Sequence, residues 1–287
     1  MRNRLIILSG ILLFIIVIVL LRCHSDMSRN EWAKRYGFEK GEVYNIKIRA
    51  YGFPYIETII KNEKVSMMFD TANMTGIQVS AELAKQLKLE KIGELKHYDS
   101  AGNIRGSYNV FDSEEIFILG KKIKGEIIYE GVSNDLEGIL PPSLLLEKRF
   151  TIDYNNKFIG VSKNNFPDIK KEGFPLISNS RYPGMPVVEG IVNGEKVLIQ
   201  LDTGMSRTCI DENLVRKLNL PANNSGYEIN SIKLGSYEFS VTNAKETSYQ
   251  GISDGYPEPI MLGIGSDIIS KIVFTVDYIN ERVIFSD

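Results

Sequence analysis

The chain opens with an almost unbroken apolar run and continues with short runs in which apolar and polar residues alternate. The first run covers residues 5–21, with Ser9 and Gly10 as its only mild interruptions. Short alternating runs rich in Ile, Val, Phe and Tyr are typical of strands, and such runs occupy residues 44–49, 56–60, 115–119 and 123–129. The pattern therefore predicts a mainly β protein with a little helix, behind an apolar N-terminal segment.

The apolar run at residues 5–21 predicts an uncleaved membrane anchor. As a helix it rises about 26 Å, which is enough for a thin bilayer. Arg2 and Arg4 precede it and favour a cytoplasmic N-terminus, so we expect a single-pass membrane protein with residues 1–4 in the cytoplasm and the chain beyond the anchor outside it. A cleavable signal peptide is the alternative, although Arg22 and Cys23 follow the run where small residues would mark a cleavage site.

The chain repeats itself with an offset of 132 residues. Residues 63–71 and 195–203 both begin with Glu-Lys-Val and end with Asp-Thr at the same spacing. A short helix is expected after each copy, with Ser80 and Asp211 as N-caps. A repeat of this kind indicates that one structural unit occurs twice.

A second pair of motifs closes each half of the chain. Residues 150–154 and 274–278 share the pattern Phe-Thr-Ile/Val-Asp-Tyr, and an apolar stretch with glycine precedes each. Each half is therefore expected to run from a strand through an Asp-Thr turn, a short helix and hairpins to the apolar glycine segment and final strands. The predicted organisation is a polar stalk at 22–40, lobe one at 41–163, a connector rich in Pro, Asn, Ser and Lys at 164–184, and lobe two at 185–287.

Composition excludes several classes of function. With 34 basic and 36 acidic side chains the formal net charge is −2, so no basic field favours nucleic acid. The two cysteines, Cys23 and Cys209, are not expected to pair. Together with only His24 and His97 they cannot build a Cys/His zinc cluster, and we expect no metal or cofactor. A Ser-His-Asp triad would depend on His97 and lacks a G-x-S-x-G elbow.

The repeated Asp-Thr turns carry the candidate chemistry. A single such turn is more often structural, with the aspartate accepting backbone hydrogen bonds. Two copies at matched positions favour a functional pair, because a pseudo-twofold relation would bring Asp70 and Asp202 face to face. Two close carboxyl groups cannot both ionise readily, so they share a proton. We therefore expect the ionised member to activate a water while the other donates to a scissile carbonyl oxygen.

Neighbouring residues of the two turns are expected to support this pair. Thr71 and Thr203 would hydrogen-bond across the interface between the lobes. Glycine at the third position leaves room where the turns approach, and the first turn has alanine there and one extra residue. The predicted supporting residues are Thr71, Ala72, Thr75, Thr203, Gly204 and Ser206.

These residues resemble a known family. Residues 201–210 with Leu218-Asn219-Leu220 are similar to the pattern of bacterial retropepsin-like aspartic proteases, and residues 138–154 resemble that family's apolar loop below the catalytic turn. The resemblance covers about residues 45–287. It implies two pseudo-twofold-related acid-protease β-barrel lobes in one chain, as in pepsin-type enzymes, a polypeptide substrate and a monomeric catalytic unit. Ala72 and Pro141-Pro142 depart from the family's glycines.

A difference in length predicts a flap in lobe one. Asp70 is 50 residues from Gly120, whereas Asp202 is only 33 residues from Gly235. The 17 additional residues surround Ala-Gly-Asn at 101–103, which is a hairpin signature. Our hypothesis is a flap over the substrate formed by Tyr98, Gly102 and Tyr108, with Tyr98 or Tyr108 facing the cleft. The alternative is a surface hairpin that does not contact the site.

The sequence thus favours a membrane-anchored aspartic endopeptidase that acts on polypeptides outside the cytoplasm. The main alternative is an inactive pseudoprotease of the same fold that binds peptides or a membrane partner. Ala72, Met74 and Pro141-Pro142 motivate that alternative. A purely structural module is disfavoured, because nothing structural requires two aspartates in register.

Overall fold

A computed structural model describes residues 27–98, 104–112, 115–123, 126–132, 135–164 and 173–286. The predicted anchor at residues 5–21 and the predicted cytoplasmic tail at 1–4 lie outside these residues. Within the described ranges, no helix has both the length and the apolar character needed to span a membrane.

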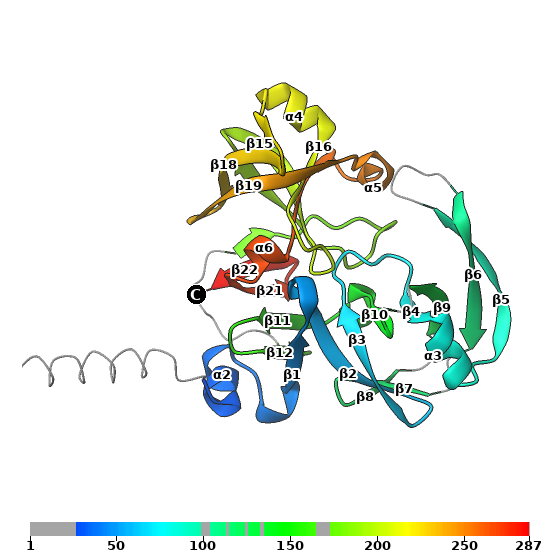
Figure 1. The fold of residues 1–287 in the computed structure, drawn as a ribbon. Coiled ribbons are helices and arrows are strands. Elements are labelled where there is room, and N and C mark those ends of the chain that lie inside the picture. Colours follow the sequence, from blue (N-terminus) through cyan, green and yellow to red (C-terminus); the bar gives the residue numbers. More distant parts are fainter. Residues whose placement is uncertain are drawn as a thin grey trace, which may run out of the picture.

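The fold is mainly β, with about half of the residues in strands and a six-stranded β-barrel (Figure 1). The elements of the first half (residues 41–163) and of the segment before it are α2 (Arg29–Arg35), β1 (Val43–Ile48), β2 (Pro54–Ile60), β3 (Glu63–Phe69), β4 (Ile77–Ser80), α3 (Ala81–Gln86), β5 (Lys91–Tyr98), β6 (Ile104–Asp112), β7 (Ile116–Ile118), β8 (Lys121–Ile123), β9 (Ile127–Val132), β10 (Gly138–Leu140), β11 (Arg149–Asp153) and β12 (Phe158–Ser162), with short 3₁₀ turns at Lys40–Glu42, Ala50–Gly52 and Pro142–Leu145.

The remaining elements belong to the connector and the second half (residues 185–287). They are β13 (Gly173–Pro175), β14 (Val187–Val192), β15 (Glu195–Leu201), β16 (Cys209–Asp211), α4 (Glu212–Leu218), β17 (Ala222–Asn223), β18 (Gly226–Leu234), β19 (Tyr237–Thr247), α5 (Gln250–Ser253), β20 (Ile260–Ile264), α6 (Ser266–Ile269), β21 (Val273–Asp277) and β22 (Arg282–Ser286).

The same order of strand pairing occurs in both halves. In the first half β3 runs parallel to β10, β10 antiparallel to β4, and β4 parallel to β9. In the second half β15, β20, β16 and β19 pair in the same order and directions. The predicted helices follow as α3 and α4, and the predicted N-caps are confirmed because the side chains of Ser80 and Asp211 accept backbone N–H groups there.

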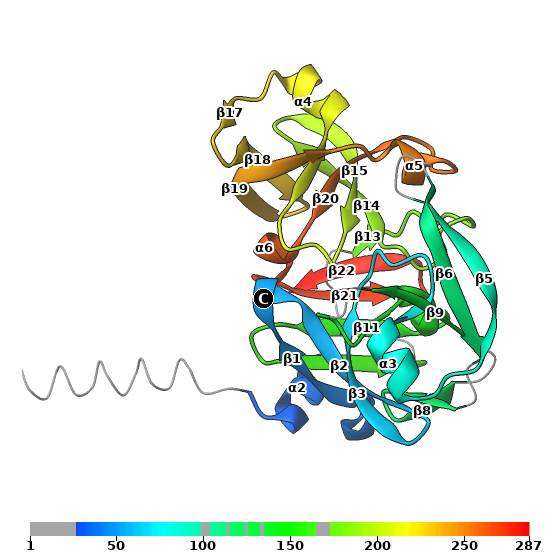
Figure 2. The ribbon, with the colours of Figure 1, turned by 45° about the vertical axis from the view of Figure 1, so that its right-hand side comes forward.

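The two Phe-Thr-Ile/Val-Asp-Tyr motifs join the halves at the middle of the molecule. They form β11 and β21, which pair antiparallel with Thr151 opposite Thr275. The hydroxyl groups of these two threonines are 2.6 Å apart in the buried centre. Figures 1 and 2 show β11, β12, β21 and β22 lying between the strands of the two halves.

The two faces of β11 serve different neighbours. Side chains alternate along a strand, and the ring of Phe150 on one face contacts Phe69 edge-on, at 5.3 Å between centroids, just before Asp70. On the other face Asp153 accepts a hydrogen bond from Trp32 Nε1 of α2 at 2.8 Å. The central sheet thus supports the first turn on one side and holds α2 on the other.

Part of the predicted polar stalk at 22–40 is therefore folded. Ser28 and Glu31 form a capping box at the start of α2, and Trp32 is completely buried. The guanidinium group of Arg149 donates to the carbonyl oxygen of Tyr36 at 3.1 Å, which ties the end of the helix to β11. Trp32 packs against Tyr36 and Phe38 of the same segment, and its contacts with Asp153 and Phe158 attach this segment to the central sheet.

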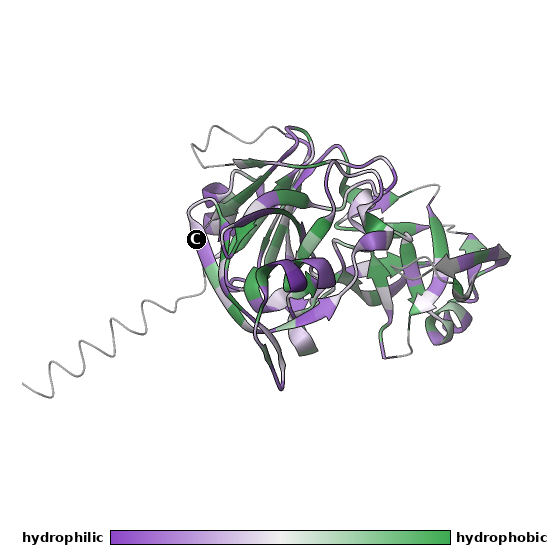
Figure 3. Cartoon of the chain, turned by 90° about the horizontal axis from the view of Figure 1, so that it is seen from above, coloured by the Kyte–Doolittle hydropathy of each residue, from purple (hydrophilic) through white to green (hydrophobic). Residues whose placement is uncertain are grey.

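Apolar side chains concentrate along the strands, as Figure 3 shows from above. One core cluster runs through both halves and includes Phe69, Phe150, Leu201 and Phe274. A smaller cluster covers another face of the second half, and its buried members are Met185, Val187, Leu198, Tyr249, Tyr256 and Ile260.

Candidate active site

Asp70 and Asp202 stand at the ends of two equivalent strands. Asp70 follows β3 and donates its backbone N–H to the carbonyl oxygen of Leu140 at 3.0 Å. Asp202 follows β15 and donates in the same way to Ile264 at 3.0 Å. Each turn is therefore fixed to the neighbouring parallel strand of its own half.

The two turns are held together by reciprocal threonine hydrogen bonds. Thr71 donates its backbone N–H to Thr203 Oγ1 at 3.0 Å, and its hydroxyl donates to the carbonyl oxygen of Leu201 at 2.7 Å. Thr203 donates its N–H to Thr71 Oγ1 at 3.0 Å and its hydroxyl to the carbonyl of Phe69 at 2.6 Å. Both threonines are completely buried. The expected bonds across the interface are thus present, and they fix one turn against the other.

The carboxyl groups of Asp70 and Asp202 meet at this junction. Each lies within side-chain hydrogen-bonding reach of the other. Each carboxyl also accepts the backbone N–H two residues further along, from Ala72 and Gly204, both at 2.8 Å. A Cβ atom at Gly204 would overlap the carboxyl group of Asp70, so this position has room only for glycine. Ala72 keeps a negative φ, which an L-residue adopts without strain.

The surroundings favour one shared proton between the two carboxyl groups. Burial raises the pKa of Asp70, although backbone N–H groups of its turn oppose the shift. Burial also raises the pKa of Asp202, and the negative charge of Asp70 adds to the effect. The two carboxyl groups therefore hold one proton between them over a wide range of pH.

The extra residue of the first turn is accommodated by a buried asparagine. The side-chain oxygen of Asn73 accepts the N–H of Thr75 at 3.0 Å and the amide of Gln78 at 2.9 Å. Its amide nitrogen donates to the carbonyl of Gly76 at 2.7 Å. Sequence reasoning missed this role of Asn73, because its partners are set by the path of the turn.

The second turn is stabilised differently, by α6. Ser266 donates its N–H to the carbonyl oxygen of Met205 at 2.7 Å. Asp267 Oδ1 accepts both the N–H and the hydroxyl of Thr208 at 2.9 Å. Sequence reasoning missed Asp267 as well, although it lies only four residues after the predicted apolar glycine segment.

Thr75 and Ser206 lie on the two turns as predicted but do not contact the carboxyl groups by hydrogen bonds. Among the residues that the structure describes, no hydrogen bond joins either hydroxyl to Asp70 or Asp202. Thr75 contributes through its backbone N–H, which donates to Asn73.

The predicted flap corresponds to the hairpin of β5 and β6, whose upper ends rise toward α5 (Figures 1 and 2). Gly102 and the side chain of Tyr98 lie outside the described residues. Tyr108 packs within the sheet, since a Cβ at Gly131 of β9 would lie 2.8 Å from its ring and equally close to the amide of Gln78. Tyr108 and Gln78, which holds Asn73, thus both lie over Gly131.

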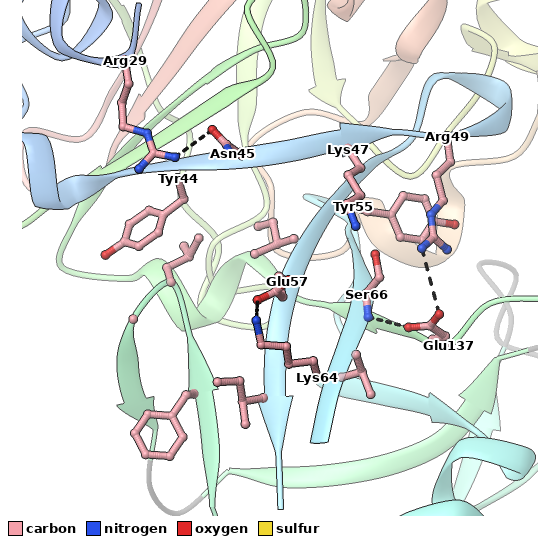
Figure 4. A pocket seen from close by; sticks show the side chains of 16 residues that line it. Arg29, Tyr44, Asn45, Lys47, Arg49, Tyr55, Glu57, Lys64, Ser66 and Glu137 are labelled. Atoms are coloured by element: carbon pink, nitrogen blue, oxygen red, sulfur yellow. Dashed lines mark hydrogen bonds and ion pairs between the residues drawn. The ribbon is translucent and has the colours of Figure 1, made fainter. Parts of the chain in front are cut away.

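A separate hollow of about 780 Å³ lies on the outer face of β1, β2 and β3 (Figure 4). Four of its charged side chains form two ion pairs, Lys64 with Glu57 at 2.9 Å and Arg49 with Glu137 at 4.0 Å. Neither Asp70 nor Asp202 lines it. Exposed pairs of this kind add little energy, and the hollow holds no arrangement comparable to the two aspartates. Within the described ranges, no group of three or more His, Cys, Asp or Glu side chains could hold a metal ion.

No family model matches the chain, and no curated protein does either. The chemistry of the site therefore has to be inferred from its geometry. Two buried carboxyl groups with raised pKa values lie close together between the two halves. Such a pair can activate a water and donate a proton to a carbonyl oxygen in the same step.

Proposed function

We propose that this protein is an aspartic endopeptidase in which Asp70 and Asp202 hydrolyse peptide bonds. The observation that carries the proposal is the close approach of the two carboxyl groups, held by the reciprocal bonds of Thr71 and Thr203. A structural role would not need two carboxyl groups pressed together, because each raises the cost of ionising the other. The repeated order of strand pairing supports reading the halves as two pseudo-twofold-related acid-protease lobes.

The proposed reaction assigns different roles to the two aspartates. Ionised Asp70 takes a proton from a water, and the resulting hydroxide oxygen attacks the peptide carbonyl carbon. Protonated Asp202 donates to the carbonyl oxygen, which gives a neutral tetrahedral diol. The proton on Asp70 then moves to the departing nitrogen, the C–N bond breaks, and Asp202 recovers its proton from the collapsing diol. General acid and base catalysis of this kind contributes about 10²–10⁴-fold to rates.

We further propose that the enzyme is anchored in a membrane and works outside the cytoplasm. The apolar run at residues 5–21 and the preceding Arg2 and Arg4 support this placement. The substrate is then a polypeptide on the far side of that membrane.

The features that suggested an inactive pseudoprotease are accommodated at the site. Ala72 still donates its N–H to Asp70, and its φ is negative. Pro141 leaves the carbonyl oxygen of Leu140 free to accept from Asp70. Met74 packs against the smaller apolar cluster instead of disturbing the carboxyl groups. We therefore favour the active enzyme.

The test is proteolysis of a random peptide library by the full-length protein in detergent, with products read by mass spectrometry between about pH 4 and pH 7. Asp70→Asn and Asp202→Asn are each expected to lower cleavage by about a thousandfold, because the acid and the base act as a unit. Asp112→Asn, at an exposed end of β6, is the matched control and should cleave like the wild type. Equal cleavage by all four proteins, or none by any, would overturn the enzyme in favour of a binding protein.

A further inference from the structure

The smaller apolar cluster lies on the face of the second half that carries Asp202. Along β15, Val197, Ile199 and Leu201 point into the main core. Side chains alternate along a strand, so Leu198 and then Asp202 face the other way. Leu198 belongs to the smaller cluster together with Tyr249. A peptide bound at Asp202 would therefore meet the side chains of this cluster.

Tyr249 reaches the position beside Asp202. A Cβ atom at Gly263 would overlap the hydroxyl oxygen of Tyr249 and would lie 2.8 Å from the end of Met205. Gly263 pairs with Gln200 in β15, two residues before Asp202, and with Cys209 in β16. The next carbonyl group, that of Ile264, accepts the N–H of Asp202. The phenol tip thus lies on the strand that borders the catalytic turn.

Tyr249 is fixed in this place. Only 6% of its surface is exposed. Its backbone N–H donates to Asp211 Oδ2 at 3.0 Å, and its carbonyl oxygen accepts the hydroxyl of Ser253 at 2.7 Å. Burial raises its pKa, and the nearby Cys209 and Asp202 add to the shift, so the phenol stays neutral. The ring is therefore a permanent wall of the site.

The first half has no such arrangement. In the first half the position equivalent to Gly263 is Ile139 of β10. Ile139 pairs with Met68, two residues before Asp70, just as Gly263 pairs with Gln200, two residues before Asp202. A side chain there excludes a phenol from the strand surface. The hydroxyl of Tyr249 thus occupies the space that a side chain at position 263 would fill. Of the two equivalent strands, only the one beside Asp202 has this arrangement.

We propose, on the basis of the peptidase function above, that Tyr249 fills the side-chain subsite next to Asp202. The substrate residue on that side of the scissile bond must then be small, such as glycine, alanine or serine. Because Gly263 has no side chain, the strand surface there leaves a space that could accept a larger substrate residue. The phenol of Tyr249 fills this space. Tyr249 is a specificity-determining residue that requires no movement to act.

The test compares cleavage specificity among tyrosine variants of the full-length protein. Peptides carry alanine or leucine at each position flanking the cleaved bond. The wild type should require alanine at one flanking position. Tyr249→Ala should raise kcat/KM for leucine relative to alanine there by about tenfold or more, because one methylene group already changes discrimination by about tenfold. Tyr249→Leu, which keeps apolar packing, should shift the same ratio in the same direction if Tyr249→Ala fails to fold.

Two further variants separate size from other effects. Tyr249→Phe keeps the ring and should keep the preference for alanine. Tyr227→Ala, on β18 and away from the small cluster, should leave the specificity profile unchanged. An unchanged leucine-to-alanine ratio in both Tyr249→Ala and Tyr249→Leu would overturn the proposal while leaving the peptidase intact.

A binding measurement keeps the two proposals distinguishable. The same alanine and leucine peptides, with a hydroxyethylene group in place of the scissile bond, can be titrated by calorimetry without turnover. A tenfold relative gain for leucine in Tyr249→Ala with no cleavage by any protein supports the subsite and overturns the peptidase. Neither cleavage nor binding by the wild type overturns both.

Discussion

Gly204 and Ala72 are equivalent residues of the two turns, yet they differ in the space around them. A Cβ at position 204 would overlap the carboxyl group of Asp70, whereas position 72 already carries one at negative φ. The two turns therefore meet asymmetrically, because the carboxyl group of Asp70 packs directly against the backbone of Gly204.

A pair of small substitutions tests this asymmetry. Gly204→Ala should push Asp70 away from Asp202 and lower kcat by about a hundredfold, because displacements near 1 Å cost about that much. Ala72→Gly should cost far less, since it removes an atom instead of adding one. Steady-state kinetics on one cleaved peptide gives both values. Similar losses in the two variants would mean that the turns tolerate the added methyl group equally.

The shared proton also makes stability depend on pH. The pKa of Asp70 is raised to about 6, and burial raises that of Asp202 as well, so the folded protein binds more protons than the unfolded chain. The stability that this pair contributes is fully present below the pKa of an aspartate in the unfolded chain, which is about 4. It is lost as the pH rises through the pKa values of the pair in the folded protein. Both carboxyl groups therefore oppose folding at neutral pH.

Asp202→Asn is accordingly expected to stabilise the protein at about pH 7, by on the order of 1–3 kcal/mol. At about pH 3 the gain should vanish, because the carboxyl groups are then protonated in both states. Thermal unfolding of variant and wild type at the two pH values measures the difference. A variant that is less stable at both would show that the hydrogen bond between the carboxyl groups outweighs the cost of the charge.

At the scale of elements, α2 is attached to the central sheet through one side chain. Trp32 is fully buried, and its Nε1–H donates to the buried carboxylate of Asp153, which also accepts from Asn156. Asp277 is the matching residue of the second half and accepts instead from Asn280 and Arg282. Trp32 of α2 thus donates to Asp153 in the first half, where Arg282 donates to the matching Asp277 in the second half.

Trp32→Phe removes this donor and keeps most of the ring. We expect the free energy of unfolding to fall by about 2 kcal/mol, because a buried carboxylate loses a hydrogen bond. Urea unfolding followed by circular dichroism measures the change. Arg29→Ala, an exposed position on the same helix that contacts Asn45, is the control and should alter stability by less than about 0.5 kcal/mol. An equal effect of both substitutions would place the stabilisation in the helix itself.

Elements defined by local repetition could be predicted from the sequence, and elements defined by distant partners could not. The two Asp-Thr turns, their threonine bonds and the caps of α3 and α4 follow from motifs that occur twice at one spacing. The docking of α2 depends on Trp32 meeting a residue 121 positions away. Tyr249 was missed for the same reason, since its role arises from Gly263 on a neighbouring strand. Asn73 was missed although its partners lie within five residues, because the path of the turn brings them together.

At the scale of the whole molecule, the site exists only where both halves meet. The threonine bonds cross from one half to the other, and β11 pairs with β21 beneath them. The two turns are supported differently, by a buried asparagine in the first half and by α6 in the second. The two carboxyl groups therefore have unequal surroundings.

Every side chain of β11 is buried, and the strand divides the space around it. On one face Phe150 packs against Phe69, the residue before Asp70, and on the other face Asp153 holds Trp32 of α2. A substitution on the first face therefore acts on the aspartate turn, and a substitution on the second acts on the attachment of α2.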